Sequence, residues 1–392
     1  MEQTLKNSKR STRSEHNQAR VINNLQVIDF SIAKQTGESA TLAERMEYYK
    51  TPGVSLAVIN DNAIEWAAGY GFLKAGETAR VTEKSIFQAA SVSKYVTAIL
   101  TLHFVEKGVL DLDTDVNRFL TSWKVPDSEF TKNKTVTLRY LLSHQAGIPN
   151  VNNIKQEAGK PEATLVQILS GKKPALTPPA VPIREPGSQW EYSNIGYTLI
   201  QLILEDITHN QLSQIADEIL FNPLGMNSST FSYPLQGDLQ KYEAWPHDSD
   251  GHAQIPEMDG LARTMGGLVT TPSDLAKLTI EVIKAYQGKS NKIISQETAR
   301  LLVTKQIEVP PEALGLPLSN GLGVFIDIST EDVCFLHPGH NSPGTTCIVV
   351  AYPALGKGAI IAVNGNVGDR LYLEILASLA IAHDWPSGQP FK

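Results

Sequence analysis

The chain has 392 residues, of which 42% are hydrophobic and 19% are charged. This length is ample for a buried core, so folding needs no disulfide or metal, and the composition excludes a disordered or fibrous chain. With 34 Lys and Arg against 41 Asp and Glu, the net charge of −7 argues against a nucleic-acid partner. No apolar run reaches the roughly 18–20 residues of a membrane span, so we expect none.

The first 20 residues are polar with scattered cations, and we expect residues 1–20 to form a solvated tail. They lack the apolar core that a secretory leader needs. The chain as it stands therefore predicts a cytoplasmic protein. If a leader has been removed from it, a periplasmic or secreted protein is the alternative.

The first regular elements predicted are a helix and an antiparallel hairpin. Residues 41–49 favour a helix, and residues 54–59 and 64–70 form β-rich runs separated by a tight turn. Residues 91–107 then follow a helical period, and Gly108 stands where a helix would end.

The middle of the chain, from about residue 110 to residue 258, favours helices and loops. Five prolines between residues 173 and 187 predict a stiff, extended loop there. A further helix is expected from Thr271 towards Tyr286, because Thr271 can cap it and a proline follows at the first helical position.

The last third of the chain predicts an antiparallel meander of short strands and a closing helix over residues 369–384. Cys334 and Cys347 flank a turn of this meander, and we expect both to be free, reduced thiols. The predicted strands are residues 322–328, 333–337, 345–352 and 359–363.

Strands at both ends of the chain must pair to bury their faces, so they most simply form one sheet. We therefore expect an α/β (α+β) fold: an antiparallel sheet flanked by helices, with an inserted all-helical domain. Residues 21–90 and 260–392 would form the sheet domain, and residues 91–259 the mostly helical domain. Ligand sites occur preferentially at the interface between domains, so we expect the active site in the cleft between these two domains.

Ser91 and Lys94 lie three residues apart at the beginning of a predicted helix. Residues at this spacing share a helix face, which brings the hydroxyl and the amine within reach of each other. The positive end of the helix dipole and burial both disfavour protonation of the amine. The pair suits nucleophilic acyl transfer, although the same spacing recurs at residues 31–34 and 170–173.

A second motif, Tyr192-Ser193-Asn194, precedes an apolar helical run. A tyrosine close to the Ser/Lys pair could relay a proton to a leaving group. The Asn194 amide could hydrogen-bond both a substrate carbonyl and Lys94. The structural alternative is a helix-capping Ser193 beside a half-buried tyrosine.

A third motif, His337-Pro338-Gly339-His340, ends a predicted strand. Glycine at such a position permits close approach of a ligand, and Pro338 requires the strand to pair on one side only or to lie at an edge. The alternative is a turn with polar side chains. We find no further metal ligands at suitable spacing, so we expect neither a metal nor a cofactor.

In this order the three motifs resemble those of the serine β-lactamase and penicillin-binding-protein superfamily. The similarity is closest to its class C branch, which includes D-amino-acid-specific peptidases and family VIII-type carboxylesterases. It extends from about residue 54 to residue 382, with supporting segments at residues 141–148, 221–226 and 266–268.

The resemblance implies a β-lactamase/transpeptidase-like fold in which Ser91 is the acylated nucleophile and Lys94 its base. Tyr192 would act with Lys94 as base and as acid for the leaving group. The backbone N–H groups of Ser91 and His340 would form the oxyanion hole. The residues expected to bind substrate are Asn194, His337, Gly339 and His340.

One departure from the family pattern bears on substrate. His337 stands where many β-lactamases have a lysine that helps hold a substrate carboxylate, and imidazole is mostly neutral at pH 7. Pro338 also removes a polar contact. We therefore expect a serine hydrolase acting on a small ester, amide or peptide, as an esterase or D-residue peptidase. The alternatives are a β-lactamase and a slowly acylated penicillin-binding sensor.

Two other classes of protein fit the sequence less well. An α/β-hydrolase needs Gly-x-Ser-x-Gly between a strand and a helix, and the chain has no such motif. A pure binding module has no use for a nucleophile with its own base, so the complete set of Ser91, Lys94 and Tyr192 argues against one. The sequence leaves the oligomeric state open.

Overall fold

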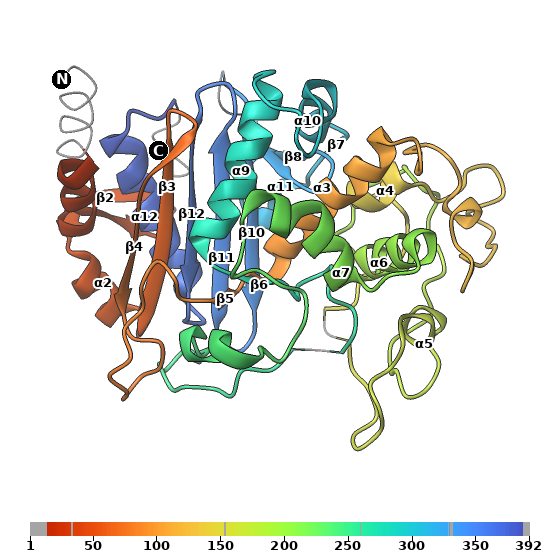
Figure 1. Ribbon diagram of the computed structural model, residues 1–392, viewed down its shortest axis with the longest axis horizontal. Coiled ribbons are helices and arrows are strands. Elements are labelled where there is room, and N and C mark those ends of the chain that lie inside the picture. The colour runs from red at the N-terminus through yellow and green to blue at the C-terminus, as the bar shows by residue number, and fades with distance from the viewer. Residues whose placement is uncertain are drawn as a thin grey trace.

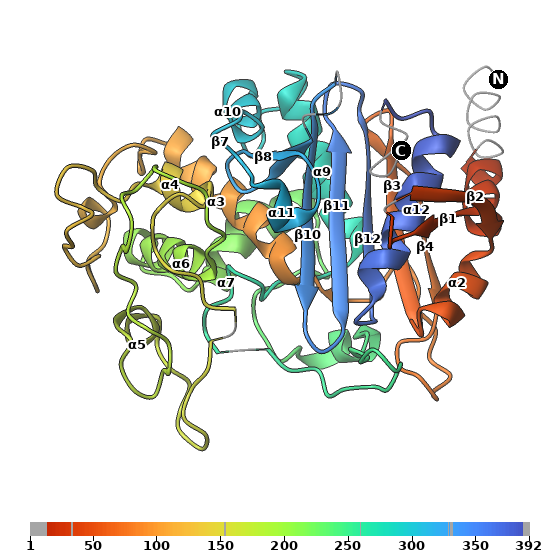
Figure 2. The ribbon, with the colours of Figure 1, turned by 180° about the vertical axis from the view of Figure 1, so that it is seen from behind.

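The computed structural model contains a large antiparallel sheet between helical layers, with a region of helices and loops beside it (Figure 1). It describes residues 14–32, 34–152, 154–258, 260–327, 329 and 332–386. Helix α9 (Pro272–Tyr286) packs on one face of the sheet, and α12 (Gly368–Ala382) covers the other, as the view from behind shows (Figure 2).

The main sheet has eight strands in the order β4-β3-β12-β11-β10-β9-β8-β7, and every neighbouring pair is antiparallel. Strands from the two ends of the chain meet where β3 pairs with β12. In chain order, the strands are β3 (Gly53–Asn60), β4 (Ala63–Gly71), β7 (Ile307–Glu308), β8 (Leu318–Asn320), β9 (Phe325–Asp327), β10 (Cys334–Asn341), β11 (Thr345–Tyr352) and β12 (Lys357–Val363).

Two small sheets and a set of mostly short helices complete the described structure. The small sheets pair β1 (Leu25–Asp29) with β2 (Lys34–Ala40) and β5 (Phe87–Gln88) with β6 (Val269–Thr270). The other α-helices are α2 (Leu42–Tyr48), α3 (Ser93–Glu106), α4 (Leu138–Leu142), α5 (Leu165–Ser170), α6 (Asn194–Thr208), α7 (Leu212–Ala216), α8 (Asn222–Leu224), α10 (Gln296–Leu302) and α11 (Pro311–Leu314). Short 3₁₀ or π turns are η1 (Ala90–Val92), η2 (Val116–Arg118), η3 (Asp217–Phe221) and η4 (Gly237–Tyr242).

Local sequence explains where these elements turn and begin. Asp61 and Asn62 both adopt positive φ, 50° and 60°, as a tight hairpin between β3 and β4 requires. The Thr271 side chain accepts from the Asp274 N–H at the start of α9. Ser193 caps α6 in the same way, because its Oγ accepts from the Gly196 N–H at 3.0 Å.

The sheet buries both of its faces, because residues of opposite parity on its central strands enter different cores. On β12, Ile360 and Ala362 face the core that contains α3, α6 and α9, whereas Ile361 and Val363 face the core beneath α12. This explains why the central strands are apolar on both faces rather than alternating with polar residues.

The predicted antiparallel sheet flanked by helices is confirmed, and Cys334 and Cys347 are free and buried. The division between residues 21–90 with 260–392 and residues 91–259 stays a prediction. The polar tail is shorter than predicted: residues 14–23 are helical, and the Asn17 amide donates to Glu65 Oε1 at 3.2 Å. Residues 1–13 lie outside the described part of the chain.

Sequence analysis missed β1, β2, β5, β6, β7 and β8, which are short or polar and lack a clear period of two. The predicted strand over residues 322–328 is shorter than expected, since β9 begins at Phe325. Within the described ranges, none of the helices has the length and apolar character needed to cross a bilayer.

Strand β10 pairs along most of its length on one side only. Its pairing with β11 runs from Phe335 to Asn341, but its pairing with β9 covers only Cys334 to Leu336. This one-sided pairing at Pro338 is what the missing proline N–H requires. The turn η1 packs against β10.

Gly339 allows this contact between β10 and η1. A Cβ at this position would lie 2.5 Å from Ala89 O and 2.9 Å from Ser91 N, distances that real Cβ atoms do not show. The closely approaching backbone is therefore the protein's own, whereas the sequence suggested that of a ligand. Any side chain at residue 339 must push Ser91 away from the sheet.

We expect Gly339→Ala to lower the free energy of unfolding by about 1–3 kcal/mol, since the added methyl overpacks a contact between two backbones. Urea denaturation measures this. The matched control is Gly196→Ala in α6, where a Cβ would meet only ordinary contacts of 3.5 Å or more. Helix propensity favours alanine there by about 1 kcal/mol. Equal stability of the two variants would contradict the packing described here.

Candidate active site

Ser91 lies in η1, immediately before α3, and its side chain is partly exposed. The preceding Ala90 has a φ of 48°, in the left-handed region that residues other than glycine rarely adopt. Ser93 holds this turn in place, because its Oγ donates to Ala90 O at 2.6 Å and accepts from the Leu268 N–H at 2.9 Å. The strained turn therefore presents the Ser91 hydroxyl in one defined position.

Lys94 is completely buried, and its Nζ lies 3.2 Å from Ser91 Oγ. The same nitrogen donates to the backbone carbonyl of Met265. Burial lowers the pKa of Lys94 well below its ordinary value. Among the residues that the structure describes, no carboxylate forms an ion pair with this lysine. The amine can therefore lose its proton and act as a base towards Ser91.

Tyr192 reaches the same hydroxyl from the segment before α6. Its OH donates to Ser91 Oγ at 2.9 Å, and Lys94 Nζ lies 4.9 Å from the centre of its ring. Burial raises the pKa of the Tyr192 hydroxyl, so the phenol keeps its proton at neutral pH. Residues far apart in the sequence thus place a base and an acid on one serine.

His337 and Gly339 lie on the face of β10 that is turned towards η1 and α3. The His337 ring is 2% exposed, lies 5.3 Å from the Phe325 ring, and has its Nδ1 2.8 Å from Pro338 O. Burial, followed by the positive charge of Lys94, lowers the pKa of His337 to about 3. His337 is therefore neutral, and it does not line the cavity beside Ser91.

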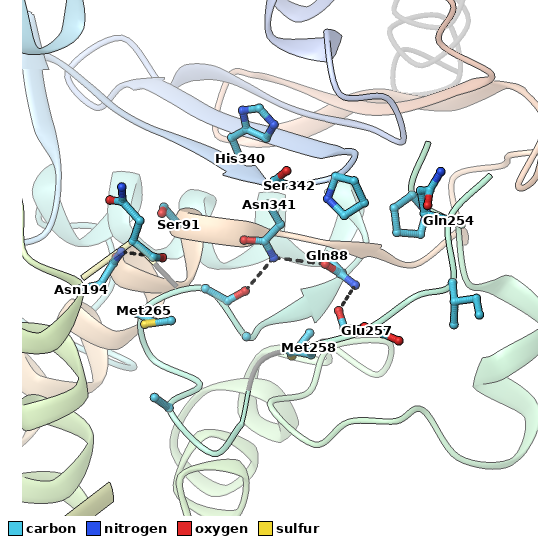
Figure 3. A pocket seen from close by; sticks show the side chains of 17 residues that line it. Gln88, Ser91, Asn194, Gln254, Glu257, Met258, Met265, His340, Asn341 and Ser342 are labelled. Carbon is cyan, nitrogen blue, oxygen red and sulfur yellow. Dashed lines mark hydrogen bonds between the residues drawn. The ribbon is translucent and has the colours of Figure 1, made fainter. Parts of the chain in front are cut away.

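His340 borders that cavity, but its ring points away from it (Figure 3). Its Nε2 lies 2.8 Å from Asn366 Oδ1. The placement leaves the backbone of His340, rather than its imidazole, facing the substrate side.

Asn194 lines the cavity at the start of α6. Its Nδ2 donates to Val151 O at 3.1 Å, and its backbone N–H donates to Asn150 Oδ1 at 3.0 Å. The sequence suggested that this amide could hydrogen-bond a substrate carbonyl and Lys94, and the structure shows its Nδ2 bonded to the 150–152 loop.

The cavity beside Ser91 encloses about 390 Å³. Sequence analysis missed much of its wall, which comes from β5, the end of β10 and the loop before β6. In this wall Gln88 Oε1 accepts from Asn341 Nδ2 at 3.1 Å, and Gln88 Nε2 donates to Glu257 O at 3.0 Å (Figure 3). The other lining residues are Asn152, Pro246, Gln254, Ile255, Met258, Ala262, Met265, Gly266, Gly267, Ser342 and Pro343.

The charge of this wall is unusual for a site that would hold an anion. Among the described residues that line the cavity, none is Lys or Arg, and Glu257 is an acid. Within the described part of the chain, no group of three or more His, Cys, Asp or Glu side chains could hold a metal ion.

A family model described as Beta-lactamase matches residues 39–382. Penicillin-binding protein 4 of Amycolatopsis lactamdurans is 32% identical over 189 residues, which cover 48% of this chain and 46% of that protein. Protein flp of Staphylococcus aureus (strain N315) is 22% identical over 233 residues, 57% of this chain and 44% of that protein. The matched part of this chain thus spans less than half the length of these curated relatives.

Solved structures share the fold at low sequence identity. The octameric penicillin-binding protein homologue from Pyrococcus abyssi has a TM-score of 0.72 and 24% identity, covering 88% of this chain and 76% of that chain. The D-alanine carboxypeptidase AmpC from Burkholderia cenocepacia has a TM-score of 0.67 and 19% identity, covering 87% and 96%. The family match covers most of the chain and confirms the resemblance seen in its motifs: the chain belongs to the Beta-lactamase family.

Proposed function

We propose that this protein is a serine hydrolase that forms a covalent acyl-enzyme on Ser91 with an uncharged ester or amide. An esterase or D-residue peptidase is the activity that fits best. The observation that carries the proposal is the contact of one hydroxyl with two partners, Lys94 Nζ at 3.2 Å and Tyr192 OH at 2.9 Å.

The geometry supports a sequence of proton transfers that balances. The neutral Lys94 amine takes the proton of Ser91 Oγ while that oxygen attacks the substrate carbonyl. The backbone N–H groups of Ser91 and His340 would stabilise the oxyanion. Tyr192 gives its proton to the leaving group and regains one from the Lys94 ammonium. Water then attacks the acyl-enzyme, and the same groups act in reverse.

The electrostatics of the cavity favour an uncharged substrate. Penicillins and the C-terminal ends of peptides carry a carboxylate, which needs a cation or several donors when it leaves water. The described cavity wall holds no Lys or Arg and includes the acidic Glu257, and His337 is neutral. A β-lactamase or carboxypeptidase is therefore less well supported than an esterase or a peptidase that binds an internal D-residue.

Ser91→Ala should abolish both a mass adduct and turnover with a p-nitrophenyl ester, because the nucleophile is lost. We expect the wild-type protein to show a burst followed by steady release, measured by stopped-flow absorbance and intact mass. A fluorescent penicillin serves as the second probe. A stable penicillin adduct without ester turnover would favour the sensor alternative, and wild-type rates in Ser91→Ala would contradict the mechanism.

Lys94→Met should lower kcat/KM by roughly 10²–10⁴-fold, at least as much as Tyr192→Phe, because the base lies next to the nucleophile. For the wild-type protein, kcat/KM should rise with pH through the lowered pKa of Lys94, as the amine loses its proton. Near wild-type rates in both variants would show that the two roles are wrong.

Lys94→Met should also raise the free energy of unfolding of the protein at neutral pH. Between the lowered pKa of folded Lys94 and the ordinary pKa of the unfolded chain, the unfolded state binds the extra proton. Wild-type stability therefore rises with pH across that window, and Lys94→Met should flatten this dependence. Thermal unfolding at several pH values measures both effects.

A neutral p-nitrophenyl ester should be hydrolysed with a kcat/KM at least about tenfold above that of a matched ester with a carboxylate on its acyl chain. Glu257→Gln should narrow this difference, because it removes the acid from the cavity wall. Glu312→Gln in α11 is the matched control, since residue 312 does not line the cavity. Equal use of the two esters by the wild-type protein would contradict the proposed substrate class.

A further inference from the structure

Tyr192 acts from a segment without regular structure, so its position depends on what holds that segment. The residues on either side of Tyr192 both hydrogen-bond to His144. The Glu191 N–H donates to the His144 carbonyl at 2.8 Å, and the Ser193 N–H donates to His144 Nδ1 at 3.2 Å. One residue thus fixes the backbone immediately before and after the tyrosine.

The His144 ring also packs directly against the tyrosine. The two ring centres are 4.4 Å apart, and the Tyr197 and Trp190 rings lie 5.3 Å and 6.2 Å from the histidine. His144 is 3% exposed. Its φ of 60° lies in the left-handed region, a strained conformation that usually persists where the surrounding structure requires it.

The hydrogen bond from Ser193 determines the protonation state of the ring. Because Nδ1 accepts an N–H, it carries no proton, so the neutral ring carries its proton on Nε2. Burial and the positive charge of Lys94 keep the pKa of His144 well below its ordinary value, with a smaller contribution from His337. If Nδ1 carried a proton, Nδ1–H and the Ser193 N–H would both be donors, and the hydrogen bond between His144 and Ser193 would be lost.

We propose that His144, in its neutral form, is a positioning residue that directs the Tyr192 hydroxyl at Ser91. The inference rests on the proposed function, because it gives Tyr192 a task in proton transfer. His144 acts through the tyrosine and exchanges no proton with the substrate. Misplacing a catalytic group by about 1 Å can lower a rate by as much as 10²-fold, which makes such support measurable.

Two substitutions of similar size separate the hydrogen bond from packing. In His144→Asn, Oδ1 takes the place of Nδ1 as acceptor, and asparagine tolerates positive φ. His144→Leu fills similar space but offers no acceptor. We expect His144→Leu to lower kcat for a p-nitrophenyl ester by roughly 10–100-fold with KM changed less than about threefold, and His144→Asn to restore most of the loss.

A double-mutant cycle tests whether His144 acts through Tyr192. In a Tyr192→Phe background, His144→Leu should lower kcat by less than about threefold further, because the group that it positions is already gone. Additive losses would overturn the inference, as would equal damage from His144→Asn and His144→Leu. Should His144→Leu fail to fold, His144→Gly suits the positive φ and removes the same acceptor.

The two proposals fail in different ways. Undiminished turnover in Ser91→Ala would overturn the proposed function, and this inference with it. Loss of turnover in Ser91→Ala together with additive His144 and Tyr192 effects would overturn only the positioning role. Circular dichroism and thermal unfolding of each variant provide the check on folding.

Discussion

The site depends on the close approach of two backbones, β10 and the turn η1. Strand β9 stops pairing at Leu336, which leaves the rest of β10 open on that side, and Gly339 lets the turn pack there without a side chain between them. The turn that carries Ser91 is thereby held against the sheet, while α3 continues from it into the core. A central strand and a buried helix are rigid supports, so the positions of Ser91 and Lys94, the proposed nucleophile and base, are fixed by the core.

The site also depends on the burial of Lys94, and this burial lowers the stability of the folded protein. An ammonium taken out of water without a carboxylate partner is unfavourable, so the folded state prefers the neutral amine. The same preference suits Lys94 to the proposed role of a base near neutral pH. His337 and His144 are buried and uncharged beside it, and each has its pKa lowered in part by Lys94. The surroundings thus add polar groups to the site without adding charge.

Sequence reasoning was most reliable where local geometry decides the outcome. The Ser91–Lys94 contact follows from helical spacing alone, and the one-sided pairing of β10 follows from Pro338. The position of Tyr192 followed only from the family resemblance, because no local rule brings residue 192 to residue 91. Gln88 was missed as part of the cavity wall, because it reaches the backbone of Glu257 through a tertiary contact that carries no periodic signal.

The alternation of side chains along β10 explains why the third motif was interpreted incompletely. Successive residues of a strand point to opposite faces, so once Gly339 faces η1, His337 must face the same core and the His340 ring must face away. His337, which was expected to bind substrate, is therefore buried beside Phe325, and the His340 ring points away from the cavity that His340 borders. A lysine at position 337 would place a second ammonium in the core beside Lys94. The neutral imidazole of His337 adds a polar ring beside the buried Lys94 without a second charge, and β10 therefore supplies no cation to the described cavity wall.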